Sequence, residues 1–202
     1  HDLHCRVTGP AVAQLAMSFF RDWAYTTRRH LQEFTVPGDF PDLTATGDTT
    51  LRIVDSGPGE NYLGTRNLFC AAATMAQKSL EIMTPYMVPG PEFIALLGLA
   101  AARGVEVRII VPRHNNHKFV DWAARSFYRD LLRSGVRIFE RRGLFSHTKA
   151  LLVDETWGFM GSSNCDSRSF RLNFEQLTRQ RTGLHLLQPY RFGYRQIGRA
   201  HV

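Results

Sequence analysis

The chain has little cysteine and no long apolar run, and each absence excludes a class of protein. Its three cysteines, Cys5, Cys70 and Cys165, are too few and too scattered for a disulfide framework, and they form no CxxC pair for zinc or thiol redox chemistry. The longest apolar stretch, Phe93 to Ala102, is about half of the ~20 residues that span a bilayer. The scattered cysteines fit a reducing compartment. The sequence also begins without Met or a cleavable leader, so we expect a segment whose upstream part is absent.

Acidic residues are absent from the C-terminal end, and this absence explains most of the basic character of the chain. Lys and Arg number 25 against 18 for Asp and Glu, a net charge of +7, but residues 176–202 hold five arginines and no acid. Without that segment the balance is 20 against 18, or +2. The body therefore lacks the basic excess of a nucleic-acid-binding surface, and we expect no nucleic-acid partner.

The rest of the composition, 44% hydrophobic and 21% charged, is that of an ordinary globular chain. Apolar residues that recur with a period of two predict strands, and those with a period of 3.6 predict helices. The expected strands are residues 3–7, 51–54, 80–84, 105–111, 136–138, 150–153 and 156–160; the expected helices begin at about 11, 65 and 91, and another closes at Gly135. This alternation predicts an α/β layered fold, with a mixed, largely parallel sheet flanked by helices and with Phe19, Phe20 and Trp23 in the core.

One stretch combines the residue types that phosphoryl chemistry needs. It runs His147-Thr-Lys149-Ala-Leu-Leu-Val-Asp154, continues six residues later with Gly161-Ser162-Ser163-Asn164, and ends at Glu175. Along an extended chain, His147 and Lys149 point to the same side. A histidine can attack phosphorus or protonate a leaving oxygen, while Lys, Asn and Ser donors hold the phosphate oxygens. The set predicts a phosphoryl-transfer site that needs no metal or other cofactor if a second cation lies opposite.

The spacing of these residues resembles the signature of the phospholipase D superfamily: His-x-Lys, four residues, Asp, six residues, Gly-Ser-x-Asn. Six identities at fixed spacing arise by chance at about 10⁻⁸ per starting position. Further segments resemble bacterial cardiolipin synthases, namely residues 2–12, 84–89, 101–108, 123–128 and 168–175. The resemblance covers residues 1 to about 175 and implies a phospholipase D-like layered sandwich.

The resemblance also implies roles for the site residues. His147 resembles one of two family histidines that alternate as phosphohistidine nucleophile and general acid. Lys149 and Asn164 resemble the phosphate clamp, with Ser162 beside it. Glu175 is expected to orient, through Nδ1, the imidazole of the other half of the enzyme. Asp154 belongs to the signature, and we expect it mainly to hold the turn after its strand.

Such synthases contain two His-x-Lys motifs, one in each half, whereas this chain contains one. We therefore expect residues 1–47 to be the end of the first half, whose motif is missing, and residues 48–175 to be the second half. Residues 176–202 are expected to form an atypical basic tail, because they show no clear periodicity. The stretch from Thr35 to Asp48, with its prolines and glycines, marks the boundary. The missing N-terminal half is the expected partner.

Three functions fit these observations. The resemblance implies a phosphatidyltransferase that makes cardiolipin and glycerol from two molecules of phosphatidylglycerol, an anionic phospholipid. It would act at the cytoplasmic side of the cell membrane, which it would reach through the absent upstream segment. The alternative is a phospholipase D-type phosphodiesterase or nuclease, in which a second identical chain completes the single motif. The third is an inactive module that binds anionic lipid, and the intact His147, Lys149 and Asn164 argue against it.

Two other patterns have simpler explanations. His114 and His117 have the spacing of a metal-binding pair, but no third ligand lies near them in the sequence, so we expect a loop. Lys118, Arg125 and Arg129 recur at helical spacing, which usually marks a solvated face. The alternative is that they contact anionic headgroups.

Overall fold

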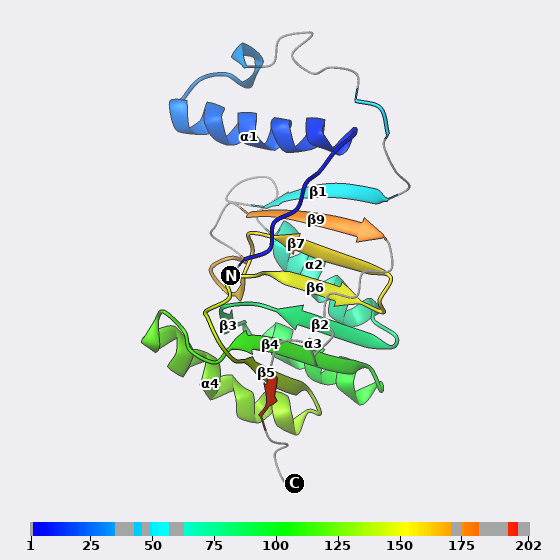
Figure 1. Ribbon diagram of the computed structural model, residues 1–202, viewed down its shortest axis with the longest axis vertical. Helices are drawn as coiled ribbons and strands as arrows, with labels where there is room; N and C mark the ends of the chain where they lie inside the picture. Colours follow the sequence, from blue (N-terminus) through cyan, green and yellow to red (C-terminus); the bar gives the residue numbers. More distant parts are fainter. Residues whose placement is uncertain are drawn as a thin grey trace.

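The computed structural model describes residues 2–34, 43–45, 49–56, 63–170, 175–181 and 194–197. The strands in these ranges are β1 (Thr50–Ser56), β2 (Ser79–Met83), β3 (Met87–Val88), β4 (Glu106–Pro112), β5 (Arg137–Arg141), β6 (Ala150–Val153), β7 (Trp157–Gly161), β8 (Cys165–Asp166), β9 (Glu175–Arg181) and β10 (Tyr194–Gln196). Eight of them form one sheet in the order β1-β9-β7-β6-β2-β4-β5-β10, and β3 and β8 form a short parallel pair (Figure 1).

The helices alternate with the strands much as the sequence predicts. They are α1 (Ala11–Thr27), α2 (Gly64–Met75), α3 (Pro91–Ala102) and α4 (Lys118–Arg133), with a short 3₁₀ turn η1 (Leu31–Glu33). Pro91 begins α3, where its missing N–H costs nothing, and Gly104 beyond it takes a φ of +89°, which lets the chain turn into β4. None of the helices in the described ranges is long and apolar enough to cross a bilayer.

The sheet is mixed, as expected, but its parallel pairing is limited to three neighbouring strands. The neighbours β2, β4 and β5 pair in parallel, and the other pairings in this sheet are antiparallel. By direction alone, β1, β7, β2, β4 and β5 run one way and β9, β6 and β10 run the other. Parallel pairing is confined to the strands joined by helical crossovers, because the tight turn at Asp154 and Glu155 forces β6 and β7 to be antiparallel.

One face of the sheet carries the hydrophobic core. Alternate residues of the central strands, such as Leu80 and Ile82 of β2, are fully buried against the helices. The helices contribute Phe69 from α2, Leu97 from α3 and Leu131 from α4. Burying each such side chain stabilises the fold by about 1.5–3 kcal/mol before entropy is counted. The core therefore holds α2, α3 and α4 on the same side of the sheet.

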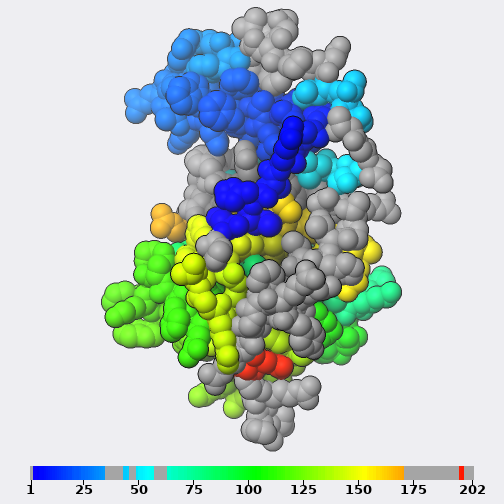
Figure 2. Space-filling model, viewed as in Figure 1, coloured from blue at the N-terminus to red at the C-terminus, as the bar shows by residue number. Residues whose placement is uncertain are grey.

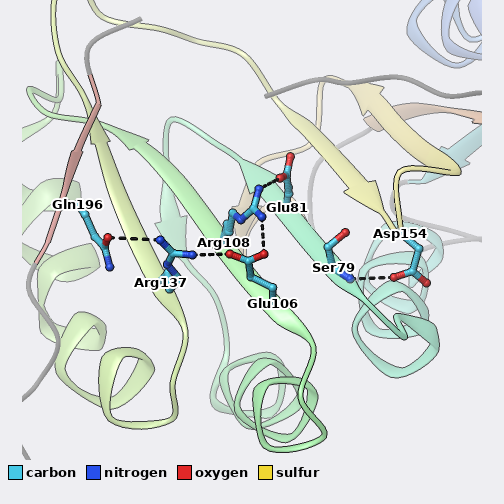
Figure 3. A network of polar contacts seen from close by, with 7 residues as sticks. All are labelled: Ser79, Glu81, Glu106, Arg108, Arg137, Asp154 and Gln196. Atoms are coloured by element: carbon cyan, nitrogen blue, oxygen red, sulfur yellow. Dashed lines mark hydrogen bonds and ion pairs between the residues drawn. The ribbon is translucent and has the colours of Figure 1, made fainter. Parts of the chain in front are cut away.

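The intervening residues of the same strands form a charged network on the other face (Figure 3). Arg108 of β4 bonds Glu81 of β2 at 2.5 Å and also pairs with Glu106. Arg137 of β5 pairs with Glu106 and lies 3.5 Å from the side chain of Gln196 in β10. Burial raises the pKa of the Glu81 carboxyl, and the charge of Arg108 opposes that rise. The network ties four strands together across the sheet.

The prediction of a strand at residues 3–7 is wrong. Residues 2–8 form no strand, and they run from the start of α1 past the edge of the sheet toward β6 (Figure 1). An alternating segment becomes a strand only where a neighbour completes its backbone hydrogen bonds. No described strand pairs with this segment.

The prediction that Phe19 and Trp23 lie in the core is also wrong. Their side chains are 55% and 48% exposed and stack on each other, while Phe20 is half-buried. Helix α1 lies beside the sheet edge and contacts β1 through polar groups: the Ser18 hydroxyl donates to Asp55 at 2.6 Å, and Arg21 pairs with the same carboxylate. Because its sheet-facing side is polar, the aromatic side of α1 points outward.

The expected tail begins inside the sheet. Residues 176–181 belong to β9, which lies between β1 and β7 and pairs with both in antiparallel register. Residues 194–196 form β10 at the other edge, beside β5. The sequence of β9 is mostly polar, which is why hydrophobic periodicity does not reveal it. The expected boundary near residue 47 and the residues 182–193 and 198–202 lie outside the described residues.

Candidate active site

The motif residues gather at one edge of the sheet. The parallel strands β2, β4 and β5 end there, and β6, which is antiparallel to β2, begins there. His147 and Lys149 lie just before β6, and Asn164 lies just after β7. Open α/β sheets commonly place their reactive groups at the carboxyl ends of parallel strands, because the loops that leave those strands converge there.

Lys149 and His147 form a close pair. The Nζ atom of Lys149 lies 2.9 Å from Nδ1 of His147 and also donates to the backbone oxygen of His147. The lysine is 9% exposed, whereas the imidazole side chain is 47% exposed. An ammonium can only donate, so in this arrangement Nδ1 accepts and Nε2 carries the proton. Nε2, the ring nitrogen that does not face Lys149, is then the atom that can meet a ligand.

Asp2 is a further group beside the imidazole that sequence reasoning did not assign to the site. Its Oδ2 lies 3.7 Å from Nδ1 of His147, and both side chains are about half exposed, at 45% and 47%. A carboxylate that approached Nδ1 more closely would hold a proton there and leave Nε2 as a lone pair. Only the fold brings Asp2 near His147, because the two residues are distant in the sequence.

Two aromatic rings flank His147. The rings of Tyr86 and Phe145 each lie 6.0 Å from the imidazole, with Tyr86 edge-on at 73°. The Tyr86 hydroxyl donates to Oδ1 of Asn116 at 2.9 Å, which links the segment after β2 to the loop after β4. These rings limit how far the imidazole can turn.

Asn164 is a half-buried residue at the same edge of the sheet. The β3 and β8 register, Met87 opposite Cys165, places Asn164 next to Tyr86. Its Oδ1 is buried and meets no hydrogen-bond donor among the described residues. An unpaired buried amide oxygen costs about 1–3 kcal/mol, and a rotation of the amide would present its NH2 donor instead. The exposed Ser162 and the buried Ser163 precede it on the same turn.

Asp154 lies away from these groups, at the far end of β6. Its carboxylate accepts hydrogen bonds from the backbone N–H groups of Gln77, Lys78 and Ser79, at 3.0, 2.7 and 2.9 Å. Figure 3 shows the bond from Ser79. Partial burial by itself raises the pKa of Asp154, but these bonds outweigh that effect and hold the pKa below its ordinary value. Asp154 also has a φ of +51° in the turn between β6 and β7.

Glu175 is the last of the predicted site residues, and His114 and His117 are the histidines for which a loop was predicted. Glu175 begins β9, where its backbone pairs with Ser56, and the position of its side chain is outside what the structure describes. His114 and His117 are exposed at the start of α4, and no cluster of three metal-ligating side chains occurs in the described part of the chain.

Comparison with solved structures shows which fold the chain adopts. It superposes on Nuc of Salmonella typhimurium, a phospholipase D family member, with a TM-score of 0.56 at 21% identity, covering 67% of this chain and 84% of that one. NucT of Helicobacter pylori gives 0.57 at 18% identity, covering 67% and 87%. The architecture is therefore a phospholipase D fold, and the fold predicted from the sequence is confirmed.

Sequence comparison narrows the class to a family. Residues 69–182 match the family described as cardiolipin synthase, PLD-like domain, and the chain belongs to that family. It is 34% identical to the major cardiolipin synthase ClsA of Bacillus subtilis over 174 residues, which cover 86% of this chain and 36% of that protein. A cardiolipin synthase of Staphylococcus aureus (strain Mu50) gives 35% identity, covering 86% and 35%. The chain thus spans about a third of the length of these relatives.

Proposed function

We propose that this chain supplies one half of the active site of a phosphatidyltransferase that makes cardiolipin from two molecules of phosphatidylglycerol. The observation that carries the proposal is the pairing of Lys149 with His147 at the carboxyl-end edge of the sheet, in a chain that belongs to the cardiolipin synthase family. The pair offers a nucleophile or acid beside a fixed positive charge, which is what a phosphodiester needs.

The proposed reaction has two steps on one phosphorus atom. In the first, the Nε2 lone pair of one histidine attacks phosphorus, and glycerol leaves with a proton donated by the second histidine. In the second, that histidine takes a proton from the hydroxyl of another phosphatidylglycerol, whose oxygen attacks phosphorus and releases the first histidine. His147 is one of the two, and Lys149 and Asn164 stabilise the charge on the phosphate oxygens.

The second histidine has to come from outside the motif described above. A single imidazole cannot attack phosphorus on one side and protonate the leaving oxygen on the other. The only His-x-Lys pair in the chain is His147 and Lys149. We therefore assign the second histidine to an N-terminal half of the same enzyme, which acts at the cytoplasmic side of the membrane. Residues 1–47 would be the end of that half and residues 48–175 the core of the second half.

The test is reconstitution. The chain would be assayed on phosphatidylglycerol vesicles alone and with a recombinant first half taken from a relative, while cardiolipin formation is followed by mass spectrometry. We expect negligible product from the chain alone, product when both halves are present, and none when the chain carries His147→Ala. Cardiolipin formed by the lone chain at a rate linear in its concentration would contradict the proposal.

A phosphodiesterase or nuclease that works as a homodimer is the second candidate, because a single motif per chain also fits a site completed by an identical copy. The same assay distinguishes it. Activity of the lone chain that rises with the square of its concentration would support this candidate. Trapping labelled phosphate on the protein would exclude an inactive lipid-binding module.

A further inference from the structure

The first turns of α4 expose two large aromatic side chains in contact with each other. Phe119 is 82% exposed and Trp122 is 65% exposed, and their rings meet edge to face at 5.7 Å. Leu144, in the loop after β5, is 72% exposed. A soluble surface gains nothing from presenting two large apolar rings in contact, so the Phe119–Trp122 cluster indicates a surface that another phase or molecule covers.

This exposed cluster lies on the same edge of the sheet as the candidate active site. His117 caps the start of α4, its ring is 6.0 Å from that of Tyr86, and the Tyr86 ring is 6.0 Å from that of His147. The backbone of Arg113, before α4, bonds Arg141, where the Leu144 loop begins. Figure 2 shows α4, in green, projecting from the left side of the molecule.

The charge around the aromatic pair is positive. Between residues 113 and 133 there are five basic side chains, Arg113, Lys118, Arg125, Arg129 and Arg133, against two acids, Asp121 and Asp130. Arg125 is engaged by Asp121 at 3.0 Å and by Glu140 at 3.2 Å. Lys118, the first residue of α4, and Arg129, about three turns further along, are exposed.

We propose that the exposed side of α4 that carries Lys118, Phe119, Trp122 and Arg129 is the surface by which this chain docks on an anionic lipid bilayer. Indole and phenyl rings favour the boundary between headgroups and acyl chains, and basic side chains near an anionic surface add electrostatic attraction. Interfaces between proteins also favour aromatic and Arg side chains, but the excess of basic groups beside the rings favours an anionic surface. The inference rests on the proposed function, since a phospholipid substrate would be reached from this edge.

Docking on the bilayer brings the site to its substrate while the substrate remains in the bilayer. With the aromatic pair at headgroup depth, the sheet edge that holds His147 lies close to the layer of phosphodiesters. Phosphatidylglycerol then reaches the site without leaving the bilayer, so its two acyl chains are not exposed to water.

Vesicle sedimentation tests the surface without requiring turnover, so its outcome is independent of the proposed reaction. The 202-residue chain would be mixed with vesicles of phosphatidylglycerol and phosphatidylcholine, or of phosphatidylcholine alone. We expect binding to the anionic vesicles and an at least tenfold weaker partition coefficient for the Phe119→Ala/Trp122→Ala double variant. The matched control is Phe19→Ala/Trp23→Ala, which removes two similarly exposed aromatics from α1 and should change binding less than twofold. Lys118→Glu/Arg129→Glu should weaken binding to anionic vesicles alone, and less so at high salt.

Tryptophan fluorescence provides the second measurement. With Trp23→Phe and Trp157→Phe, Trp122 is the only tryptophan, and we expect a blue shift and quenching by lipids brominated on the acyl chain when anionic vesicles are added. Equal binding by the α4 and α1 double variants, no binding by the wild-type chain, or unchanged Trp122 emission would overturn the proposal. So would loss of self-association, measured by sedimentation velocity, in an α4 variant that still binds vesicles, because the cluster would then be a contact between copies.

Discussion

Lys149 and Asp154 belong to one sequence motif, yet they lie at opposite ends of strand β6, roughly 16 Å apart along an extended chain. The ammonium of Lys149 contacts His147 at one edge of the sheet. The carboxylate of Asp154 binds the backbone of Gln77, Lys78 and Ser79 at the other edge. The first residues of the motif therefore contribute to the candidate site, whereas its last residue, Asp154, binds the backbone at the start of β2.

We expect Asp154→Asn to destabilise the fold by about 2 kcal/mol, because an amide replaces a charged acceptor of three backbone donors. Urea unfolding followed by circular dichroism measures the change. The exposed neighbour Glu155 is the control, and Glu155→Gln should alter the free energy of unfolding by less than about 0.5 kcal/mol. Equal effects of the two substitutions would mean that the backbone contacts of Asp154 contribute little.

The lowered pKa of Asp154 predicts a pH dependence of this difference. A carboxyl with a lower pKa in the folded state stabilises the fold above its unfolded pKa, about 3.9, and this stabilisation is lost as the pH falls through the folded value. The stability gap between the wild-type chain and Asp154→Asn should therefore be full at pH 6 and shrink below pH 4. A gap that is constant from pH 6 to pH 2.5 would contradict the prediction.

In the reassembled two-half enzyme, Lys149→Ala and Asn164→Ala should each reduce kcat by about 10²-fold or more, because each removes a donor to the phosphate oxygens. Lys78→Ala is the control, since that exposed lysine lies at the opposite edge of the sheet. Rates on phosphatidylglycerol vesicles, compared with urea midpoints, separate chemistry from stability. If Asp154→Asn kept full stability and lost as much activity as Lys149→Ala, Asp154 would belong to the reacting site.

Truncation tests the place of β9 in the sheet. A chain that ends at Arg181 keeps β9 and should melt within a few degrees of the full chain. A chain that ends at Phe174 loses the strand between β1 and β7 and should melt at least about 5 °C lower or fail to fold. Scanning calorimetry of both chains decides this. The same melting temperature for both would show that β9 contributes nothing to the sheet.

The buried carboxylate of Glu81 should make Arg108 important for stability. Glu81 is 6% exposed, and Arg108→Met would leave its charge without the partner at 2.5 Å. We expect a loss of about 3 kcal/mol for that variant and a smaller loss for Glu81→Leu/Arg108→Met, because the double variant removes both charges. A double-mutant cycle in urea, with Glu81→Leu alone as its fourth corner, measures the coupling. A double variant less stable than Arg108→Met would refute this account.

The order of strands and helices between β1 and β7 was predictable from the sequence, because their apolar residues repeat with the period of the element that buries them. The motif was also visible, because its spacing follows the geometry of one strand and one turn. Three predictions were wrong because hydrophobic periodicity does not show which segments pair with each other or which apolar faces become covered. The segment 3–7 alternates but has no neighbour to pair with, β9 pairs on both sides but is mostly polar, and α1 has an apolar stripe that the chain does not cover.

The sequence by itself determined which residue types are available for chemistry and which elements hold them: His147, Lys149 and Asn164 around two short strands. Only the tertiary structure decided what lies beside them. It brings Asp2, Tyr86 and the start of α4 to the same edge and sends Asp154 to the other. The reason is physical: periodicity records whether a side chain faces the core, whereas contacts between distant residues depend on strand order and direction, which local patterns do not encode.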